Sequence, residues 1–413
     1  MIILYELKLI AYNNIRLETW IIIISAFMFL WLGTITVILS KDINKIPKSK
    51  TANREKLFSV ITDNEKLIML IIIIFTIIGS ISAYYHWKEL IERFGSVTNA
   101  LIQSSIIYRL RVEGKISTGI PYLFGFVHAS LVLGGIYSAL KGKVSLFLLL
   151  PFIVLAIKSL AEVARAGMLL GIIEFSVSYL LFNQYIKSLE IRKVKVKIRN
   201  TIIGTIIVLS LFIGTIVIVK FFRAPVDNYK ASTRTLQEWK GGVIFSPTIY
   251  MYLSSDIGIL DAYLVDENEK NSFGQQTFFP LYRLLSKFST VDKPSYYQKG
   301  YFIPIWSNTG TYLRDLLADF GYVGVFLFPF LLGLAITFFW YRFLINGSMI
   351  SFIITIYLYI IIALSFLNIA TRLGNWLIGF VILLVIVYVL RNNFKFKPYF
   401  ANDKFSLNST LSN

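Results

Sequence analysis

The chain alternates long apolar blocks with polar segments that hold most of its charge. Residues 20–39, 67–85 and 201–219 are each apolar over about twenty positions, the length that a helix needs to cross the hydrocarbon core of a bilayer. Outer-membrane β-barrels are excluded, because their strands alternate apolar and polar residues over only about ten positions. Nine such blocks predict nine membrane-spanning helices, at about 18–39, 67–86, 120–140, 144–161, 166–183, 201–219, 322–343, 349–367 and 374–390.

The composition agrees with an all-α polytopic membrane protein. Apolar residues make up 56% of the chain and charged residues 15%, against about 45–50% and about 25% in soluble globular proteins. A soluble enzyme and a disordered chain are therefore excluded. The absence of cysteine excludes disulfides and thiolate metal sites, and two histidines, His86 and His128, are too few for a histidine-rich metal site. We expect no metal and no other cofactor.

The net charge of +18 comes largely from basic loops. In a soluble protein this charge would suggest nucleic acid, but in a membrane protein basic loops mark the cytoplasmic side, so no nucleic-acid partner is expected. Basic residues concentrate in 41–66, 187–199 and 391–404. The nine predicted spans place all three segments on one side, which is therefore the cytoplasmic side.

This orientation divides the chain into four parts. They are an N-terminal bundle of about six spans at 1–219, an extracytoplasmic cap loop at 220–321, C-terminal spans at 322–392 and a cytoplasmic tail at 393–413. Residues 87–119, 162–165 and 368–373 also face outward. The N-terminal tail lies outside as well, unless residues 2–12 form a tenth, short span that places the N-terminus in the cytoplasm.

The outer loop 220–321 is predicted to fold as a small cap. A structureless loop of about a hundred residues is unusual, and this one has nearly balanced charge and many aromatic side chains. Residues 246–260 and 277–288 show amphipathic helical patterns, and Pro247 fits the first turn of a helix. We therefore expect a partly helical cap on the outer face of the membrane.

Arg165 is the first candidate for chemistry, because it stands between two apolar blocks. A charge at membrane depth is costly and often functional. The alternative is structural: Arg165 reaches the outer interface with its long side chain or pairs with Glu162. In the same way, Lys158 is expected to reach the interface, and His128 to be a packed, hydrogen-bonded histidine and not a catalytic one.

Arg109 and Arg111 lie at alternate positions before the third predicted span. A guanidinium stays charged and binds phosphate oxygens through two parallel hydrogen bonds, so this pair is a candidate anion site. The alternative is an interfacial helix whose arginines contact lipid headgroups. Arg372, at the outer end of the eighth predicted span, either joins such a site or, as we favour slightly, anchors the helix at the interface.

The most distinctive local pattern comes at the end of the outer loop. Asn308 and Thr311 precede Asp319, Gly321 and Gly324 there. Composition does not explain this pattern. A structural explanation is that the two glycines allow a turn into the seventh predicted span, while Asp319 caps that helix.

At these residues the chain resembles the oligosaccharide repeat-unit polymerases, the Wzy-type enzymes of O-antigen and capsule assembly. That family has an Asn-x-x-Thr segment before an Asp-Phe-Gly-x-x-Gly entry into a late span, which 308–311 and 319–324 match. It also has an outer stretch with arginine and glycine before a middle span, similar to 109–119, and a single arginine at the start of a later span, similar to Arg165. The resemblance covers roughly residues 65–345.

The resemblance implies a membrane-embedded glycosyltransferase of the C type in a bacterial inner (plasma) membrane, with its active face outside. Such an enzyme transfers a growing glycan from undecaprenyl diphosphate onto the outer sugar of a new lipid-linked repeat unit. Its expected partners are these undecaprenyl-diphosphate-linked oligosaccharides, the lipid bilayer, a flippase and a chain-length regulator. It needs neither a nucleotide sugar nor a metal.

The residues and the resemblance together suggest a site. Outer arginines would hold the diphosphate and stabilise its departing charge, a carboxylate would accept the proton of the attacking hydroxyl, and cap aromatics would stack on sugars. The candidate catalytic residues are Arg165, Asp256 and Glu113, with Glu162 and Asp319 as further outer carboxylates; the candidate substrate-binding residues are Arg109, Arg111, Tyr250, Asn308, Thr311 and Arg372; Asp319, Gly321 and Gly324 are expected to be structural.

Three other functions compete with polymerisation. A lipid-linked glycan ligase shares the donor and the fold type, but its resemblance would centre on a histidine in the large outer loop, and 220–321 contains none. A polysaccharide flippase or secondary transporter usually shows internal repeats, broken helices and charges at the midplane, which are not evident in the sequence. A purely structural scaffold would not need the outer arginines.

Overall fold

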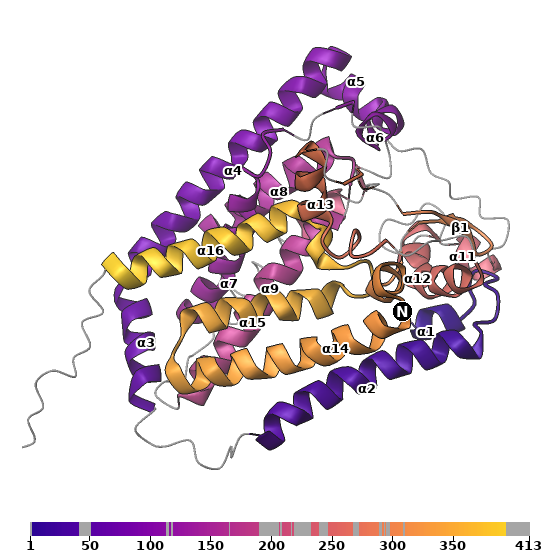
Figure 1. Ribbon diagram of the computed structural model, residues 1–413. Helices are drawn as coiled ribbons and strands as arrows, with labels where there is room; N and C mark the ends of the chain where they lie inside the picture. Colours follow the sequence, from indigo (N-terminus) through magenta and orange to yellow (C-terminus); the bar gives the residue numbers. More distant parts are fainter. Residues whose placement is uncertain are drawn as a thin grey trace, which may run out of the picture.

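The computed structural model describes most of the chain. The described residues are 2–40, 51–112, 115–116, 119–164, 166–189, 206, 209–215, 217–218, 233–238, 247–266, 272–288, 291–292, 294, 298–308 and 310–393. They form α-helices, short 3-10 helices and one small antiparallel hairpin (Figure 1).

The elements follow one another in this order. The first half contains α1 (Ile2–Glu6), α2 (Leu17–Ser40), α3 (Thr51–Asp63), α4 (Glu65–Phe94), α5 (Val97–Ile102), α6 (Ser104–Val112), α7 (Gly125–Lys141), η3 (Leu146–Leu148), α8 (Leu149–Ala161) and α9 (Ala166–Ser188). The second half contains α11 (Arg234–Glu238), α12 (Pro247–Val265), α13 (Phe279–Leu285), η4 (Ser286–Phe288), β1 (Tyr301–Phe302), β2 (Trp306–Ser307), α14 (Tyr312–Asn346), α15 (Met349–Leu364), η5 (Ala370–Arg372) and α16 (Gly374–Asn393).

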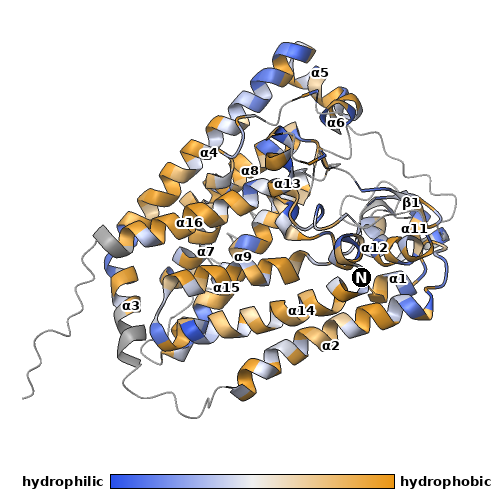
Figure 2. Ribbon diagram, viewed as in Figure 1, coloured by the Kyte–Doolittle hydropathy of each residue, from blue (hydrophilic) through white to orange (hydrophobic). Residues whose placement is uncertain are grey.

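Four of the described helices, α2, α4, α9 and α14, are long and apolar enough to cross a membrane. The η3–α8 segment, α15 and α16 are shorter apolar helices, and Figure 2 shows hydrophobic residues running along these elements. The prediction of an all-α membrane protein with transmembrane helices is therefore confirmed. Helices lie on eight of the nine predicted blocks, while the block 201–219 falls largely outside the described residues.

The cap lies at one end of the bundle. In Figure 1, α1, α11, α12 and β1 gather at one end of α2 and α14, and α3 lies at the other side of the molecule. α12 packs against α1, α2 and α14. The two helices predicted in the outer loop are present, as α12 and as α13 followed by η4. The outer loop is thus partly helical, as its sequence predicts.

The N-terminal segment packs on the cap and does not cross the membrane. α1 has only five residues, too few for a span. The rings of Tyr5 and Tyr12 stack with their centroids 4.5 Å apart, and Tyr12 Oη lies 2.7 Å from Ser254 Oγ in α12. The alternative of a tenth span at 2–12 is therefore wrong. The segment lies with the cap, on the side predicted to be outside.

α14 connects the cap to the membrane. It begins at Tyr312, well before the predicted start of the span at 322, and Gly321 interrupts it with φ 60° and ψ −154°. This backbone conformation is open to glycine and strained for residues with a Cβ. The kink agrees with the predicted turn at Gly321 and coincides with the predicted boundary between the cap and the C-terminal spans.

α7 lies at the centre of the bundle. Every residue from Val127 to Leu140 is buried, and α4, α8, α9 and α16 pack around the helix. Glycines allow this close packing: a Cβ on Gly135 would lie 2.4 Å from the carbonyl oxygen of Phe175 in α9. α7 is therefore shielded from lipid by its neighbours.

α2 and α14 cross at a close contact between Gly33 and Gly333. A Cβ on Gly33 would lie 2.1 Å from the carbonyl oxygen of Phe330, and a Cβ on Gly333 would lie 2.1 Å from that of Leu30. Both obstacles are backbone atoms, so a side chain is accommodated only if the two helices move apart.

Gly333→Ala is therefore expected to destabilise the protein by about 1–3 kcal/mol, the usual cost of overpacking. The melting temperature of the purified protein in detergent measures this effect. Gly214→Ala is the matched control, because a Cβ at Gly214 meets nothing within 4 Å. Equal melting temperatures for the two variants would contradict the close crossing of α2 and α14.

Candidate functional site

Four polar side chains meet where α6 approaches the C-terminal parts of α4 and α8. They are His86, Arg111, Lys158 and Glu162, here named the outer cationic cluster after the side on which the sequence predicts them. Lys158 Nζ lies 3.0 Å from His86 Nδ1 and 3.7 Å from Glu162 Oε1. Arg111 Nη1 donates to the backbone carbonyl of Glu162 at 2.7 Å and lies 4.0 Å from Glu162 Oε2. Two cations thus share one carboxylate.

Local sequence features bring α6 over α8. Gly95 ends α4 with φ 83°, and the side chain of Ser96 accepts from the backbone N–H of Asn99 at 3.1 Å, which starts α5 in a new direction. Trp87 Nε1 donates to the carbonyl of Ile157 at 2.9 Å and ties α4 to α8. The apolar residues packed beside the cluster are Leu90, Ala100, Ile107, Ile116, Ala161 and Val163.

Lys158 points into the protein and does not reach the interface, so the predicted role as an interfacial lysine is wrong. Its side chain is 2% exposed, against 13% for Arg111 and 25% for Glu162. A cation removed from water is costly unless a negative partner compensates it. Glu162 contacts both cations, so Arg111 and Lys158 are held close to each other.

Only one of the two predicted arginines of α6 belongs to this cluster. Positions two apart lie about 200° apart around a helix, and Arg109 is exposed where Arg111 is partly buried. Arg109 is therefore not a member of this cluster, and its predicted role in substrate binding stays a prediction. Arg165 and Glu113 lie outside the described residues, although Arg165 follows Glu162 by three positions in the sequence.

A second polar cluster lies on the first turns of α14. Thr311, Asp315 and Asp319 are spaced by four residues and so share one side of the helix, here named the α14 polar row. Asp315 is fully buried and pairs with Arg372 Nη1 at 3.2 Å. The backbone N–H of Ile369 donates to Asp315 at 3.0 Å, and the Gln298 amide also donates to it. The row connects the cap, α14 and η5.

Arg372 is largely enclosed, with 10% of its side chain exposed. Besides its ion pair with Asp315, its guanidinium lies 5.5 Å from the ring centroid of Phe279. The neighbouring Arg314 is similarly enclosed: it donates to the carbonyl of Lys299 at 2.6 Å and lies 5.2 Å from the ring centroid of Tyr301. The charge of Arg372 is thus paired inside the fold, and its predicted roles in substrate binding or as an interface anchor stay predictions.

Asp319 does not cap α14, contrary to the prediction, because Thr311 occupies the N-cap position and Asp319 lies inside the helix. Its carboxylate accepts from the backbone N–H of Gln276 at 2.9 Å, from the N–H of Thr277 and from the hydroxyl of Ser272. Asp319 thus holds the turn 272–278 against α14. Its role is structural, as expected, but the contact is a different one, and the carboxylate is not placed to serve as a base.

Asp256 and Tyr250 are also built into the fold. Asp256 is fully buried in α12 and does not reach solvent. Tyr250 donates to the carbonyl of Leu4 and accepts from the N–H of Leu9 at 3.2 Å. Burial raises the pKa of the Tyr250 phenol, so the hydroxyl keeps the proton that it donates. These buried positions do not fit the predictions of Asp256 as a candidate catalytic residue and Tyr250 as a substrate-binding residue.

Asn308, Thr311 and Gly324 lie around the start of α14. Asn308 is half-buried after β2, and Thr311 is 8% exposed with no hydrogen-bond partner for Oγ1 among the described residues. A Cβ on Gly324 would lie 2.6 Å from Phe320 Cβ, so glycine is needed beside the kink. Gly324 is therefore structural, as predicted, and the two polar residues remain candidates for contact with a substrate.

His128 pairs with Glu174 between α7 and α9. His128 Nδ1 lies 2.9 and 3.0 Å from the two carboxylate oxygens, and both side chains are buried. The prediction of a packed, hydrogen-bonded histidine is confirmed. The described residues contain no group of three or more His, Cys, Asp or Glu that could hold a metal ion.

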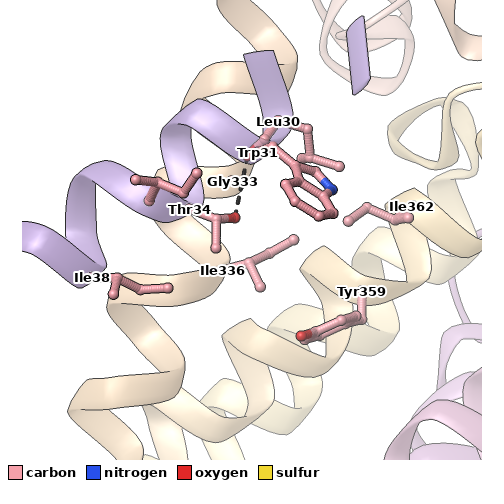
Figure 3. Close-up of a pocket in the computed structure, with 9 residues that line it drawn as sticks. Leu30, Trp31, Thr34, Ile38, Gly333, Ile336, Tyr359 and Ile362 are labelled. Carbon is pink, nitrogen blue, oxygen red and sulfur yellow. Dashed lines mark hydrogen bonds between the residues drawn. The ribbon is translucent and has the colours of Figure 1, made fainter. Parts of the chain in front are cut away.

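A groove of about 330 Å³ lies between α2, α14 and α15. Figure 3 shows Trp31 and Leu30 on one side and Ile336, Tyr359 and Ile362 on the other. The hydroxyl of Thr34 in the groove donates to the carbonyl of Leu30 at 3.2 Å. This apolar lining suits hydrocarbon and not the charged groups of a group-transfer reaction, so the groove is not the candidate site.

His86 and Asp315 were not predicted from the sequence as members of these clusters. The spacing of Asp315, four residues from both Thr311 and Asp319, could have indicated that it lies on the same side of the helix. His86 and Lys158 are 72 positions apart, and no local pattern links them.

No protein-family model, curated protein or solved structure matches this chain. The residues and their geometry therefore carry the functional inference.

Proposed function

We propose that the protein polymerises lipid-linked oligosaccharide repeat units into a surface polysaccharide, an O-antigen or a capsule, on the outer face of a bacterial inner membrane. The outer cationic cluster carries the proposal, because it brings the guanidinium of Arg111 and the ammonium of Lys158 together at Glu162, on the side that the sequence predicts to be outside. A lipid diphosphate presents its phosphates at the same depth, just outside the hydrocarbon. The resemblance of 308–311 and 319–324 to the Wzy-type polymerases supports the same reaction.

In this reaction a hydroxyl oxygen of the incoming repeat unit attacks the anomeric carbon of the growing chain. A glycosidic C–O bond forms, the bond from that carbon to the diphosphate oxygen breaks, and its electron pair leaves with the diphosphate. Arg111 and Lys158 offset the charge that develops on the leaving oxygen. The hydroxyl proton passes to a carboxylate, for which Glu162 and Glu113 are the candidates.

Arg165 completes the proposed diphosphate site. It stands in the sequence between Glu162 of the cluster and Ala166, the first residue of α9. A guanidinium at this position binds two phosphate oxygens through parallel hydrogen bonds. Arg111, Lys158 and Arg165 would then surround the diphosphate with fixed positive charge.

The cap supports the proposal through its exposed aromatic side chains. Phe278, Phe302 and Trp306 are each at least half exposed, at 50%, 76% and 51%. Rings presented to solvent beside the membrane offer apolar surfaces on which sugars stack. A helical bundle with such a cap at its outer end is the arrangement that a C-type membrane glycosyltransferase would use, and we include that class in the proposal.

The proposed partners are undecaprenyl-diphosphate-linked oligosaccharides and the lipid bilayer, with a flippase that supplies repeat units and a regulator of chain length. A nucleotide sugar is not required, because the sugar is already activated by the lipid diphosphate. In this scheme the protein needs no metal, since arginine and lysine provide the positive charge.

Deleting the gene in its host and separating the surface glycan by size tests the proposal. We expect the ladder of long chains to be lost while glycan with a single repeat unit remains, and a plasmid copy to restore the ladder. Loss of all repeat units would identify a flippase instead. Long lipid-linked chains that fail to reach their final acceptor would identify a ligase.

A further inference from the structure

The small hairpin of β1 and β2 carries two aromatic rings on one face, here named the hairpin platform. Phe302 pairs directly with Trp306 across the two strands. Directly opposite residues point to the same face, with Cβ atoms about 4.5–5.5 Å apart. The two residues are 76% and 51% exposed. The solvent face of an antiparallel pair is usually polar, so two exposed rings at these positions are a departure that calls for an explanation.

The other face of the hairpin is anchored to the cap. Ile303, between the two strands, is 4% exposed. A Cβ on Gly258 of α12 would lie 3.2 Å from Ile303 Cδ1, and Ser307 Oγ lies 3.5 Å from Ser255 Oγ in the same helix. The hairpin is thus held on α12, and this attachment fixes the direction in which the platform faces.

Gly300 allows the indole of Trp306 to lie flat against the backbone. A Cβ on Gly300 would lie 2.4 Å from Trp306 Cε2 and 2.5 Å from Cζ2. Any side chain at this position would therefore push the indole away. If the strand register is continued by one residue, Asn308 comes opposite Gly300, on the same face as the rings. The platform thus has an amide beside it, which both donates and accepts hydrogen bonds.

The size of the platform limits its occupant. An aromatic side chain offers about 150–250 Å², so two rings offer at most about 500 Å². A stable protein–protein interface buries about 800 Å² on each partner. The platform is therefore too small for a protein partner and has the size of one or two sugar rings.

The position of the platform excludes the bilayer as the occupant. The nine residues of α14 from Tyr312 to Phe320 precede the kink at Gly321, where the membrane is predicted to begin, and they rise roughly 13 Å along the helix. The headgroup layer is about 5–8 Å thick on each side. In Figure 1, β1 lies past this end of α14, beside α11 and α12. The rings therefore stand in water beyond the headgroups.

We propose that Phe302, Trp306 and Asn308 form a sugar-binding subsite of the cap, and that Gly300 positions the indole. The C–H groups on one face of a pyranose stack on the rings, while its hydroxyls exchange hydrogen bonds with the amide of Asn308. Figure 1 places β1 away from α6 and α8, so the subsite holds a sugar at a distance from the bond that reacts. That this sugar belongs to the lipid-linked glycan rests on the proposed function.

Glycan binding to the full-length protein in lipid nanodiscs tests this subsite. The probe is the host's own surface polysaccharide, released from its lipid and cut into soluble oligosaccharides, and calorimetry gives the affinity. We expect Trp306→Ala to weaken binding about tenfold and Trp306→Tyr to stay within about threefold, because a tyrosine ring still stacks. Phe302→Ala should also weaken binding. Phe273→Ala is the matched control, since this cap aromatic is 77% exposed but lies outside the hairpin.

Gly300→Ala tests the positioning role separately. Its methyl group displaces the indole, so we expect weaker binding in the normal protein and no further loss in the Trp306→Ala variant. Such non-additivity indicates that the two positions act through one another. Equal losses in both backgrounds would contradict the positioning role of Gly300.

The outcomes separate this subsite from the proposed function. No glycan binding by the normal protein, or equal binding by the normal protein and Trp306→Ala, would overturn the subsite even if gene deletion abolishes the ladder of long chains. Quenching of Trp306 fluorescence by brominated lipids, taken as the difference from Trp306→Tyr, would place the ring in the bilayer and overturn it too. Glycan binding that needs Trp306, in a protein whose deletion leaves the ladder intact, would keep the subsite and overturn polymerisation.

Discussion

Arg111→Ala is expected to slow glycan polymerisation by about 100- to 1000-fold, the effect of removing one preorganised donor from a developing negative charge. Arg111 meets this description because it is held at Glu162, beside the enclosed ammonium of Lys158. Arg111→Lys should recover little, because an ammonium lacks the paired, planar donors of a guanidinium. Polymerisation of purified lipid-linked repeat units by the protein in nanodiscs, followed by chain length, measures the rate.

Arg109→Ala is the matched control for this experiment. Arg109 belongs to the same helix and carries the same charge, but it is exposed on the other side of α6. We expect this variant to polymerise at nearly the normal rate. If both alanine variants lost activity equally, or if Arg111→Lys made normal ladders, Arg111 would contribute charge or anchoring to α6 and the diphosphate would bind elsewhere.

Arg372→Met is expected to destabilise the protein by about 3–5 kcal/mol, because it leaves the carboxylate of Asp315 buried without its cation. Asp315 is fully buried, and the guanidinium of Arg372 lies 3.2 Å from it. The double variant Arg372→Met/Asp315→Asn should recover part of this loss, since it removes the buried charge. Thermal unfolding in detergent and the amount of protein in the membrane measure both effects.

An exposed ion pair supplies the comparison. Arg234 and Glu238 lie 3.3 Å apart on α11, but their side chains are 94% and 65% exposed. Arg234→Met should change the melting temperature little, because surface ion pairs contribute little to stability. The double variant fails to exceed the stability of Arg372→Met alone only if this expectation is wrong. Equal stability of the two variants would show that Arg372→Met does not leave Asp315 as an uncompensated charge.

The membrane helices could be predicted from the sequence because hydropathy is a local property. The blocks 67–86 and 349–367 lie on α4 and α15, since any segment of this length and apolarity must leave water. The start of α14 could not be placed in the same way. Its first turns are buried by the cap and not by lipid, so their sequence reads as part of a polar loop.

The candidate site could be predicted only in part. Arg111 could be predicted because a guanidinium before the third predicted span suits phosphate oxygens. Its neighbours come from distant segments: His86 and Lys158 meet across 72 positions. The predictions for Asp256 and Tyr250 did not fit the structure for the opposite reason. An outer carboxylate or tyrosine looks the same in sequence whether it faces a substrate or, as here, a neighbouring segment of the fold. Only the burial of these side chains distinguishes the two cases.

The enclosed position of α7 affects how the protein must be assembled. Of the four helices around it, only α4 precedes it along the chain, while α8, α9 and α16 follow. A ribosome therefore delivers α7 to the bilayer before three of its four neighbours exist. Gly379 of α16 closes the face of α7 that carries His128, so this histidine-bearing surface stays uncovered until α16 has been synthesised. Assembly of the bundle around α7 therefore depends on a helix that lies far from α7 along the chain.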